Sequence, residues 1–584
     1  GRVLEGYEGD TLASALLANN IHFVGRSFKY HRPRGIIAAG SEEPNALVRV
    51  GRGARAEPNL RATQVELHDG LFAESQNRFP SLKFDIGAVN SALQAFFPAG
   101  FYYKTFMWPA SMWMTYEHVI RHAAGLGRVA DDHDDPDRYE KTNAHCDVLV
   151  AGGGIAGLMA ALQAGRSGAR VILADEQNEF GGWLLGESDV TIDGTSAADW
   201  IASAVAELSA MPEVTLLPRT TVFGYMDHNY LTLTERVTDH LGERPSHLPR
   251  QRMWKVRAGQ TVLAQGAHER PLVFSGNDLP GVMLSGAVRS YINRYGVVPG
   301  NRTVVFTNND DAYRTALALH GAGAHVVVVD LRRDLKGELV KAVRTAGIEI
   351  MSGSAVTIAA GTQRIARVEI SPVNEGASAV LDDPIHMDCD LLAMSGGLSP
   401  AVHLHSQARG KLGWDERLLC FKPTTAHEAS FSAGACNGVF DAAKAIADGL
   451  RAGTAAAKAA GFAIEQGDAP DVSAPAQSWR PLAAWTIANG KGEGEGPKAF
   501  VDFQNDVTAS DVKLAVREGY QSVEHVKRYT TLGMATDQGK TSNINGLAIL
   551  AESLGNEIPA VGTTTFRMPY TPSGFGAIAG RDIG

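Results

Sequence analysis

The run GGGIAG at residues 152–157 constrains the fold more than any other part of this sequence. It follows an apolar stretch that ends at Val150 and that we predict to be a strand, and it opens an apolar segment, residues 158–165, that we predict to be a helix. A G-x-G-x-x-G pattern between a strand and a helix is typical of a dinucleotide-binding β–α unit. Gly152 would permit the tight turn, Gly154 would let the backbone approach a pyrophosphate, and Gly157 would allow close packing of helix on strand.

Acidic residues follow this loop at the spacing that a nucleotide ribose requires. The next predicted strand, VILAD, ends at Asp175, followed by Glu176. A carboxylate about 20 residues after the glycine run is expected to accept hydrogen bonds from the adenosine ribose. The pyrophosphate would lie at the helix N-terminus, where unpaired N–H groups and the helix dipole favour an anion. Because a carboxylate repels a 2′-phosphate, this arrangement favours NAD over NADP.

Strands and helices alternate through much of the remaining chain, which predicts an α/β protein with parallel, doubly wound sheets. FGGW at 180–183, QTVLAQGAHERP at 260–271, a second α/β unit from Arg302 and AGA at 433–435 follow in that order. This order resembles the two-dinucleotide-domain flavoproteins of the glutathione and thioredoxin reductase type. In that resemblance the last motif usually reads Gly-Asp, and the Asp holds FAD. Here the pair is Gly434-Ala435, which favours a bound NAD.

The second α/β unit lacks the glycines of a nicotinamide-binding repeat. After its first strand the sequence reads Asn308-Asn309-Asp310-Asp311-Ala312-Tyr313. Two acids at a helix start would repel a pyrophosphate, and we expect them to cap the helix instead. Tyr313 would fill the place of the packing glycine. We therefore predict that this unit is structural and that NAD is held tightly in the first unit.

Two segments resemble iron–sulfur domains but lack thiolate ligands. The N-terminal block resembles a β-grasp ferredoxin-like domain, which carries C-x4-C-x2-C and a distant fourth Cys. Those positions correspond to Ala38, Glu43, Ala46 and Thr63. Residues 500–545 resemble a small helical [2Fe–2S] domain, whose ligand positions correspond to Asp502, Gln504, Asp537 and Ser542. We therefore predict no cluster in either segment, which favours an oxidase over a dehydrogenase.

Composition excludes several other classes of protein. The formal net charge of -10, without a long Lys/Arg run, argues against a nucleic-acid partner. The four cysteines have no CxxC spacing, which favours neither disulfides nor a metal site and indicates a reducing, cytoplasmic location. No apolar run reaches the roughly 18 residues that span a bilayer, so we expect no membrane segment. The aromatic-rich stretch 92–114 is expected to be buried or to lie at an interface.

The motifs FKYHRPRG, EEPNAL, GGGIAG with ADEQ, and EHVKRYTTLGMATDQGKTSN together resemble the α subunits of heterotetrameric sarcosine oxidases, over essentially the whole chain. The resemblance implies a complex with β, γ and δ subunits that converts sarcosine, O2 and tetrahydrofolate to glycine, H2O2 and 5,10-methylenetetrahydrofolate. It places NAD in the α subunit, FAD on β, and a covalent FMN at the α–β interface. Tetrahydrofolate would bind an aminomethyltransferase-like domain that begins near residue 566 and is nearly all missing. Because the chain also begins without Met inside a predicted strand, both of its ends are expected to be cut.

The resemblance also carries over individual site residues. It places the NAD site at Gly152, Gly154, Ala156, Gly157, Asp175, Glu176, Gln177, Gly182, Trp183, Val222 and Ala435. A half-site for the FMN phosphate would use Lys527, Arg528, Thr530 and Thr531, whose charges and hydroxyls suit charge-assisted hydrogen bonds. The alternative for this second group is a solvated helix end that contacts a partner subunit. No residue is an obvious base for amine oxidation, and His268 and Glu269 after a strand are weaker catalytic candidates.

These motifs predict a two-dinucleotide-domain core with an N-terminal β-grasp domain and a C-terminal helical segment. The expected parts are a β-grasp domain at 1–75, a connecting segment at 76–142, a first dinucleotide domain at 143–300, a degenerate second one at 301–390, a return to the first at 391–465, a linker at 466–497, a helical domain at 498–560 and the start of the folate domain at 561–584. Two other functions stay open. One is an FAD-containing opine- or proline-type dehydrogenase subunit, and the other is a scaffold in which bound NAD is purely structural.

Overall fold

The computed structural model describes residues 1–584 except 105–107, 124, 131, 492–494 and 581–584. The chain divides into two compact units, and each is assembled from segments that lie far apart in the sequence. Unit 1 comprises Gly1–Asp135, Glu269–Gly397 and Arg480–Thr564. Unit 2 comprises Pro136–His268, Leu398–Trp479 and Thr565–Gly584.

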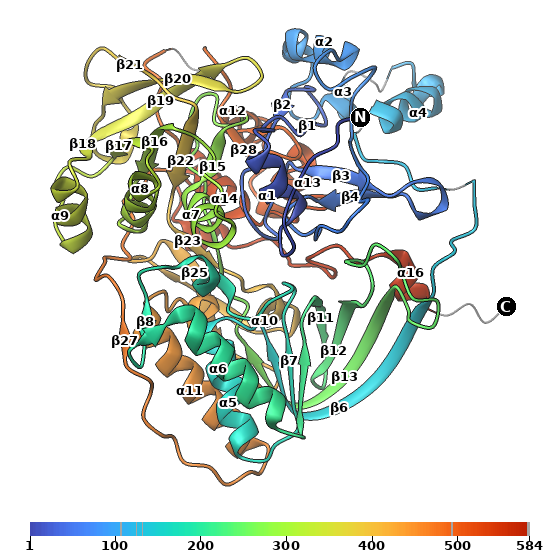
Figure 1. The fold of residues 1–584 in the computed structure, drawn as a ribbon. Coiled ribbons are helices and arrows are strands. Elements are labelled where there is room, and N and C mark those ends of the chain that lie inside the picture. The colour runs from blue at the N-terminus through green and yellow to red at the C-terminus, as the bar shows by residue number, and fades with distance from the viewer. Residues whose placement is uncertain (105–107, 124, 131, 492–494, 581–584) are drawn as a thin grey trace. The chain divides into compact units, whose positions relative to one another are not determined.

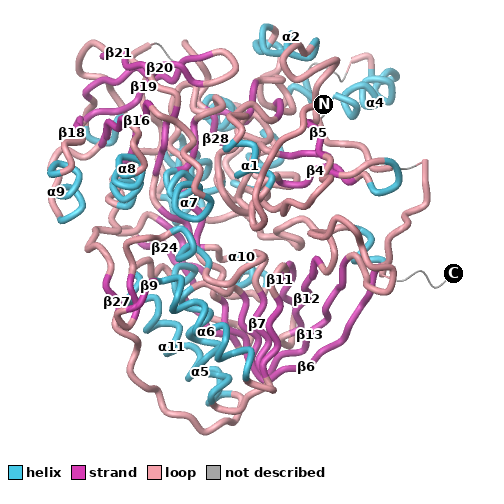
Figure 2. Tube along the Cα trace, in the orientation of Figure 1, coloured by secondary structure: helices cyan, strands magenta, loops and turns pink. Residues whose placement is uncertain are grey.

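Unit 2 is organised around one mixed sheet with strand order β10-β7-β6-β13-β12-β11, and β26 pairs with the end of β13. The strands β10, β7, β6, β13 and β26 are parallel, whereas β12 and β11 form an antiparallel hairpin beside β13. Helices α5, α6 and α11 lie together against this sheet (Figures 1 and 2). The elements are β6 (Tyr139–Ala151), α5 (Ile155–Arg166), β7 (Val171–Ala174), α6 (Ala197–Ala210), β10 (Val214–Leu217), β11 (Thr220–Met226), β12 (Tyr230–Arg236), β13 (Gln251–Leu263), β26 (Ser430–Ser432) and α11 (Ala442–Ala459).

Glycines on α11 let this helix approach α5 closely. A methyl group at Gly449 would lie 2.2 Å from the carbonyl oxygen of Ala156, and one at Gly453 would lie 2.4 Å from that of Ala160. The two helices share one apolar core with β6 and β7. Smaller elements complete unit 2: β8 (Thr191–Ile192), β9 (Thr195–Ser196), β23 (Leu398–Pro400), α10 (His403–Gln407), β24 (Lys411–Asp415), β25 (Cys420–Thr425), β27 (Val472–Ser473) and α16 (Phe575–Ala579).

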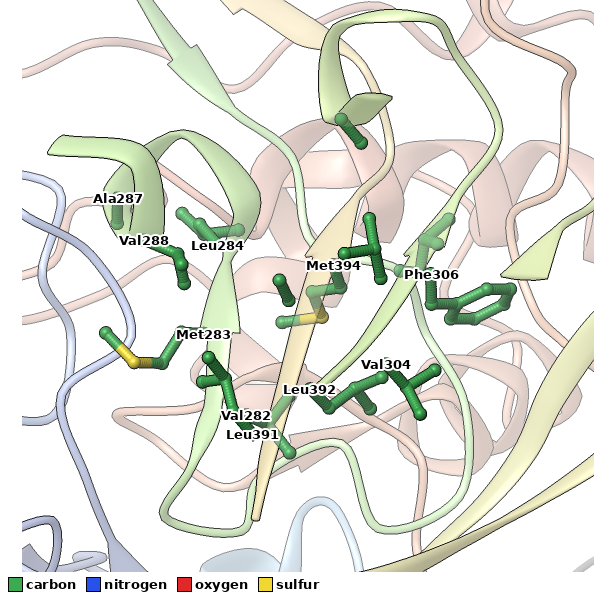
Figure 3. Close-up of a cluster of buried hydrophobic side chains, with 14 of the residues drawn as sticks. Val282, Met283, Leu284, Ala287, Val288, Val304, Phe306, Leu391, Leu392 and Met394 are labelled. Atoms are coloured by element: carbon green, nitrogen blue, oxygen red, sulfur yellow. The ribbon is translucent and has the colours of Figure 1, made fainter. Parts of the chain in front are cut away.

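Unit 1 contains the second α/β fold, a five-stranded parallel sheet of order β15-β22-β16-β17-β18. Its core joins apolar side chains of β15, β22 and β16 to those of α7 (Figure 3). The elements are β15 (Val282–Leu284), α7 (Ser285–Tyr295), β16 (Arg302–Thr307), α8 (Asp311–Gly321), β17 (His325–Asp330), α9 (Glu338–Thr345), β18 (Glu349–Ser352) and β22 (Leu391–Ser395). An antiparallel sheet adds β19 (Ser354–Gly361), β20 (Ile365–Pro372) and β21 (Ile385–Asp388).

The N- and C-terminal segments of unit 1 complete it. The first helix begins after Thr11, whose side chain forms a capping box with Ser14. The N-terminal elements are α1 (Leu12–Ala18), β1 (Gly25–Arg26), β2 (Pro33–Arg34), β3 (Leu47–Val50), β4 (Glu57–Arg61), β5 (Ala73–Ser75), α2 (Val89–Ala92), α3 (Phe101–Lys104) and α4 (Trp113–Ala123). The C-terminal ones are β28 (Phe500–Asp502), β29 (Val507–Thr508), α12 (Ala509–Arg517), α13 (Val523–Thr530), α14 (Asn543–Leu554) and α15 (Ile558–Val561).

A buried charge network ties the three segments of unit 1 together. Arg32 donates two hydrogen bonds to Asp278, at 2.6 and 2.9 Å. Arg34, which is almost fully buried, pairs with both Asp278 and Asp506. Because each carboxylate is paired with a guanidinium, the cost of burying the charges is offset, whereas removal of one partner would leave a buried charge uncompensated. The FKYHRPRG motif is therefore an internal contact between segments.

Several predicted boundaries are wrong because tertiary pairing overrides sequence order. The boundaries at 300/301 and 390/391 cut through one sheet, since β15 and β22 both pair within the second α/β fold. The first dinucleotide domain begins with β6 at Tyr139, before 143, and the predicted linker 466–497 contributes β27, which pairs with β8. Of the predicted segments, residues 105–107, 124, 131, 492–494 and 581–584 lie outside the described residues.

The aromatic stretch 92–114 is buried at Ala99, and Phe97 packs against the core of unit 1. Phe96 and Trp108 are 66% and 83% exposed, so these two side chains are not buried within this chain, and the expectation that the stretch lies at an interface stays a prediction. Among the helices in the described part of the chain, none combines the length and the apolar character needed to cross a bilayer.

Candidate dinucleotide-binding site

The glycine loop connects β6 to α5 with the geometry that its sequence predicts. β6 ends at Ala151, and Gly152 has a φ of 101°, a left-handed conformation that suits glycine. A methyl group at Gly152 would lie 2.3 Å from the carbonyl oxygen of Ala264. Gly154 is the N-cap of α5, and the first-turn N–H groups that follow it have no acceptor within the helix. This arrangement presents N–H donors and the positive end of the helix dipole to an anion.

Gly154 and Gly157 have different surroundings. A methyl group at Gly157 would lie 1.8 Å from the carbonyl oxygen of Gly152, so this glycine is required for packing. A methyl group at Gly154 would have its nearest neighbour, the Cα of Gly182, 4.0 Å away. Gly154 is thus not required by packing within the chain. Space at the helix N-terminus beside an unobstructed glycine fits the approach of a pyrophosphate.

Ala156 lies in the first turn of α5 and is buried against α11 and the late turn. A methyl group at Gly434 would lie 2.7 Å from the Cβ of Ala156, and Gly449 lies against its carbonyl oxygen. The Ala156 side chain is therefore committed to packing. Its backbone N–H, in the first turn of α5, is the group that can serve a bound anion.

Asp175 holds the glycine loop rather than facing outward. Its carboxylate accepts hydrogen bonds from the backbone N–H of Gly153 at 2.6 Å and of Gln177 at 2.8 Å, and the residue is buried. Glu176 is half-buried, and its carboxylate has no hydrogen-bond partner among the described residues. Of the two acids named from the sequence, Glu176 is the one whose carboxylate is available to ribose hydroxyls.

The segment from Phe180 to Trp183 lies directly on the glycine loop. The N–H of Gly181 donates to the carbonyl oxygen of Gly153 at 2.8 Å, and Gly181 forms a bridge with Gly154. Gly182 has a φ of 57° and lies against the Cα of Gly154. Trp183 packs on the apolar core of α5 and α6. The FGGW segment therefore lies beside GGGIAG in the folded chain.

The start of β11 joins the same edge. The N–H of Thr220 donates to the carbonyl oxygen of Asp175 at 2.6 Å, and that of Arg219 donates to Gln177 at 2.7 Å. Val222 follows two residues later, is buried, and pairs with Leu233 across the hairpin. The residues assigned to the adenosine half of the site therefore lie close together.

The late turn lies between β26 and α11. β26 ends at Ser432, Ala435 lies in a short 3-10 turn, Gly434–Asn437, and α11 begins only at Ala442. Asp448, one helical turn and more into α11, accepts the N–H of Gly434 at 2.9 Å. The tertiary structure thus supplies an acid to this turn that the linear motif lacks.

The second α/β fold has no comparable loop. Asp310 occupies the N-cap position of α8 and Asp311 lies in its first turn, as expected, but the Asp310 side chain makes no capping hydrogen bond. Asp310 pairs with Arg332 at 2.6 Å and Asp311 with Arg289 at 3.1 Å. Tyr313 is fully buried, as expected, and its hydroxyl donates to Asp330 at the end of β17 at 2.8 Å. Asp330, at the position where a nucleotide-binding repeat would have its ribose-binding acid, is therefore bonded to side chains of the protein itself.

The proposed FMN phosphate group assembles only in part. Lys527 and Arg528 occupy the last turn of α13 and reach the surface to different degrees. The hydroxyl of Thr530 is buried and donates to the carbonyl oxygen of Val526 at 2.7 Å, and that of Thr531 donates to Thr530 at 2.5 Å. Because both hydroxyl protons are already donated to carbonyl oxygens, only the two cations remain suited to a phosphate. Cations at this position also stabilise the helix C-terminus.

Glu43 occupies the centre of the N-terminal loop that resembles a cluster-binding loop. Its fully buried carboxylate accepts four backbone hydrogen bonds of 2.7 to 3.0 Å, from Ile37, Ala38, Asn45 and Ala46. Burial raises the pKa of Glu43, and the four N–H donors oppose that shift. The loop therefore organises its N–H groups around a carboxylate. Residues 1–78 contain no Cys, so the residues present do not fit an iron–sulfur cluster.

The four positions in the C-terminal helical segment are also buried, and two of them, Gln504 and Asp537, are hydrogen-bonded to each other. Asp502 accepts the N–H of Gly533 at 2.7 Å, and Gln504 accepts that of Asp537 at 2.8 Å. Burial and the neighbouring Asp537 carboxylate raise the pKa of Asp502 to about 7. Ser542 is fully buried at the start of α14. These oxygen and amide side chains do not fit an iron–sulfur cluster either. Among the residues that the structure describes, no three His, Cys, Asp or Glu side chains form a metal-binding group.

Two polar residues in the AQGAHERP segment have surroundings that the sequence did not predict. They are Gln265 and Glu269. Gln265 follows β13, and its amide oxygen and nitrogen are both buried without a hydrogen-bond partner among the described residues. Glu269 lies in unit 1, and its carboxylate accepts the N–H of Gly286, at the start of α7, at 2.7 Å. Burial, with the nearby Asp311 carboxylate adding to it, raises the pKa of Glu269 to about 8. Only tertiary burial distinguishes these two residues from other loop residues.

The fold and loop geometry are those of dinucleotide-binding α/β proteins. Residues 146–464, more than half of the chain, match the family described as pyridine nucleotide-disulphide oxidoreductase, and the chain belongs to this family. Residues 1–78 match a 2Fe-2S iron-sulfur cluster binding domain, and residues 496–581 match the sarcosine oxidase A3 domain.

The chain is homologous over its whole length to sarcosine oxidase alpha subunits. It is 48% identical to that of Rhizobium meliloti (strain 1021) and 42% identical to that of Corynebacterium sp. (strain P-1). The chain covers 57% and 56% of those proteins, so it spans little more than half of their length. These matches confirm the family resemblance inferred from the motifs.

One solved structure matches the fold of nearly the entire chain. The L-proline dehydrogenase from P. horikoshii superposes with a TM-score of 0.63 at 19% identity, covering 99% of this chain and 96% of that one. Similarity at this level of identity shows the fold alone. It confirms the expected α/β class.

Proposed function

We propose that this chain is the NAD-binding subunit of a sarcosine oxidase-type complex. The observation that carries the proposal is the loop at the start of α5, where Gly154 is unobstructed and the carboxylate of Glu176 is available at the end of β7. Gly154 and the first-turn N–H groups of α5 would hold the pyrophosphate, and Glu176 would accept hydrogen bonds from the adenosine ribose. Asp175 would act indirectly, by fixing the loop.

The dinucleotide we propose is NAD rather than FAD or NADP. The late turn has Ala435 where an FAD-binding relative would have an acid, and Asp448 is already bonded to Gly434 and to Arg451. Two carboxylates, those of Asp175 and Glu176, lie where a 2′-phosphate would be repelled. The contacts of Tyr313, Asp310 and Asp330 favour a single nucleotide site, in the first dinucleotide fold.

The remaining assignments follow from homology to sarcosine oxidase alpha subunits. In the assembled complex we propose that sarcosine is oxidised by O2 on a β subunit that carries FAD. FMN would lie at the interface with that subunit, where Lys527 and Arg528 would contact its phosphate. Further γ and δ subunits and a tetrahydrofolate-binding domain would complete the enzyme. We assign no catalytic residue within this chain. The proposed role of the glycine loop at the start of α5 is to bind and orient a nucleotide.

The direct test is acid release of bound small molecules from the purified chain, followed by mass spectrometry for NAD, NADP, FAD and FMN. We expect NAD at about one per chain and no FAD. FAD at a similar stoichiometry would overturn the proposal and favour a self-contained dehydrogenase subunit. A Gly154→Ala chain serves as the matched control, because it should fold normally and release little NAD.

A further inference from the structure

Gln265 lies at the middle of the sheet edge at which the proposed nucleotide binds. In unit 2 the parallel strands β6, β13 and β26 end together, with Leu263 opposite both Ala151 and Ser432. The glycine loop follows β6, the turn that carries Ala435 follows β26, and Ala264-Gln265 follows β13 between them. Ligands of parallel α/β sheets bind across this carboxyl edge.

The backbone around Gln265 is fixed on both sides. The ideal Cβ position of Gly152 lies 3.0 Å from the N atom of Gln265, which places the residue directly beside the glycine loop. The carbonyl oxygen of Gly266 accepts the N–H of Ala401 at 3.0 Å. On the other side, the thiol of Cys436 donates to the carbonyl oxygen of Leu263 at 2.9 Å. Gln265 is therefore held between the two loops.

The side chain of Gln265 has unsatisfied hydrogen-bonding capacity. Its amide oxygen and its amide nitrogen are both buried, and neither has a partner among the described residues. Buried amide groups are ordinarily paired, because removal from water without a replacement bond is unfavourable. A carboxamide offers two N–H donors on one atom and an acceptor on the other. Its natural complement is a ligand group with the same pair of functions.

We propose that Gln265 recognises the nicotinamide carboxamide of the bound NAD. The assignment rests on the proposed function. Glu176 and Val222 place the adenosine at the β7 side of the edge, and the glycine loop after β6 places the pyrophosphate next. The remaining half of the dinucleotide then extends toward β13 and β26, where Gln265 lies. Pairing of the two carboxamides makes Gln265 a specificity-determining residue that distinguishes NAD from nucleotides that lack the amide.

The test compares NAD with ADP-ribose, which shares everything but the nicotinamide. Both are titrated calorimetrically into the full chain after removal of bound nucleotide, using wild type, Gln265→Leu and Gln163→Leu. Gln163 is the matched control, because it is a buried glutamine of the same unit whose amide donates to the carbonyl oxygen of Glu465 at 2.8 Å. The Gln265→Leu chain should remain folded, because an apolar side chain removes the unpaired polar atoms.

We expect Gln265→Leu to weaken NAD binding about tenfold or more and to leave ADP-ribose binding unchanged. Gln163→Leu should change neither affinity. Equal weakening of both ligands would overturn the proposal, since Gln265 would then contact a shared part of the nucleotide. Unchanged NAD affinity would overturn it as well. If wild type bound neither ligand, the proposed NAD function itself would fail, which is a separate outcome.

A second variant tests the polarity of the pairing. Gln265→Glu replaces the amide by a carboxylate, which keeps an acceptor and loses the donor. We expect this chain to bind nicotinic acid adenine dinucleotide, whose ring carries a carboxylate, more weakly than NAD, because two carboxylates repel. Equal binding of these two ligands by Gln265→Glu would contradict direct contact.

Discussion

The carboxylate of Asp175 accepts the backbone N–H of Gly153 at 2.6 Å, so the acid at the end of β7 holds the glycine loop that begins after β6. Glu176, its neighbour, is the carboxylate that remains available. The two adjacent acids therefore have separable roles.

Substitution of each acid should separate loop stability from ribose binding. We expect Asp175→Asn to destabilise unit 2 by about 1–3 kcal/mol, because a buried acceptor of two N–H groups is impaired. Glu176→Gln should leave the thermal midpoint unchanged and weaken NAD binding about tenfold, through loss of a charged acceptor. Thermal melts of nucleotide-free chains and calorimetric titration measure the two effects. The reverse pattern, with Glu176→Gln destabilising, would refute this division of roles.

Substitution of two glycines in the loop, Gly157 and Gly154, should separate packing from pyrophosphate binding. Gly157→Ala would bring a methyl group within 1.8 Å of the Gly152 carbonyl oxygen and should destabilise the fold by about 1–3 kcal/mol. Gly154→Ala has no such clash and a φ of -73°, so it should melt like wild type but lose at least about tenfold in NAD affinity. Gly321→Ala on α8, which meets no atom within 4 Å, is the control for both. Normal NAD binding by Gly154→Ala would argue against the pyrophosphate site.

The contact between Tyr313 and Asp330 should be structural. Tyr313→Phe removes a buried donor from the Asp330 carboxylate, and we expect a loss of about 1–3 kcal/mol in the stability of unit 1. The stoichiometry of bound NAD should stay at one per chain. Tyr7→Phe, at an exposed tyrosine of the same unit, is the control for hydroxyl removal. A second NAD bound by wild type would contradict the structural role of the second α/β fold.

Glu43 should be a stability determinant of the N-terminal segment. Glu43→Ala leaves four buried N–H groups without their acceptor, and we expect a loss of at least about 3 kcal/mol. Hydrogen exchange at the backbone amides of Ile37, Ala38, Asn45 and Ala46 would report the loss locally. Glu8→Ala, at an exposed glutamate, should have no effect. Unchanged protection of these amides in Glu43→Ala would show that the loop is held by other contacts.

Glu269 should make stability depend on pH. Its pKa is raised from 4.5 to about 8 by burial, so between these values the folded state binds a proton that the unfolded state releases. Its contribution is complete below pH 4.5 and is lost as pH rises toward 8, by at most about 1.4 kcal/mol per pH unit. Glu269→Gln should flatten this part of the curve of thermal midpoint against pH. An unchanged slope would contradict a protonated Glu269 in the folded chain.

The sequence alone determined the parts of this protein that depend on local order. The GGGIAG run, its flanking strand and helix, and the acids 20 or so residues later specify a β–α–β unit, because each element follows directly from glycine placement and apolar periodicity. The same reasoning identified Tyr313 as a packing residue. The absence of thiolates at Glu43 and Asp502 could likewise be read directly from the residues present.

Only the tertiary structure decided what depends on contacts between distant segments. It showed that β15 and β22 pair in one sheet although about 110 residues of chain separate them. The order of elements in the sequence does not predict this pairing, because parallel strands are joined through long crossover connections. It assigned Asp175 to the loop and left Glu176 available, a choice set by hydrogen bonds to Gly153 rather than by residue type. It also buried the Gln265 amide between two loops, and burial of a polar group is a property of the folded neighbourhood rather than of its sequence.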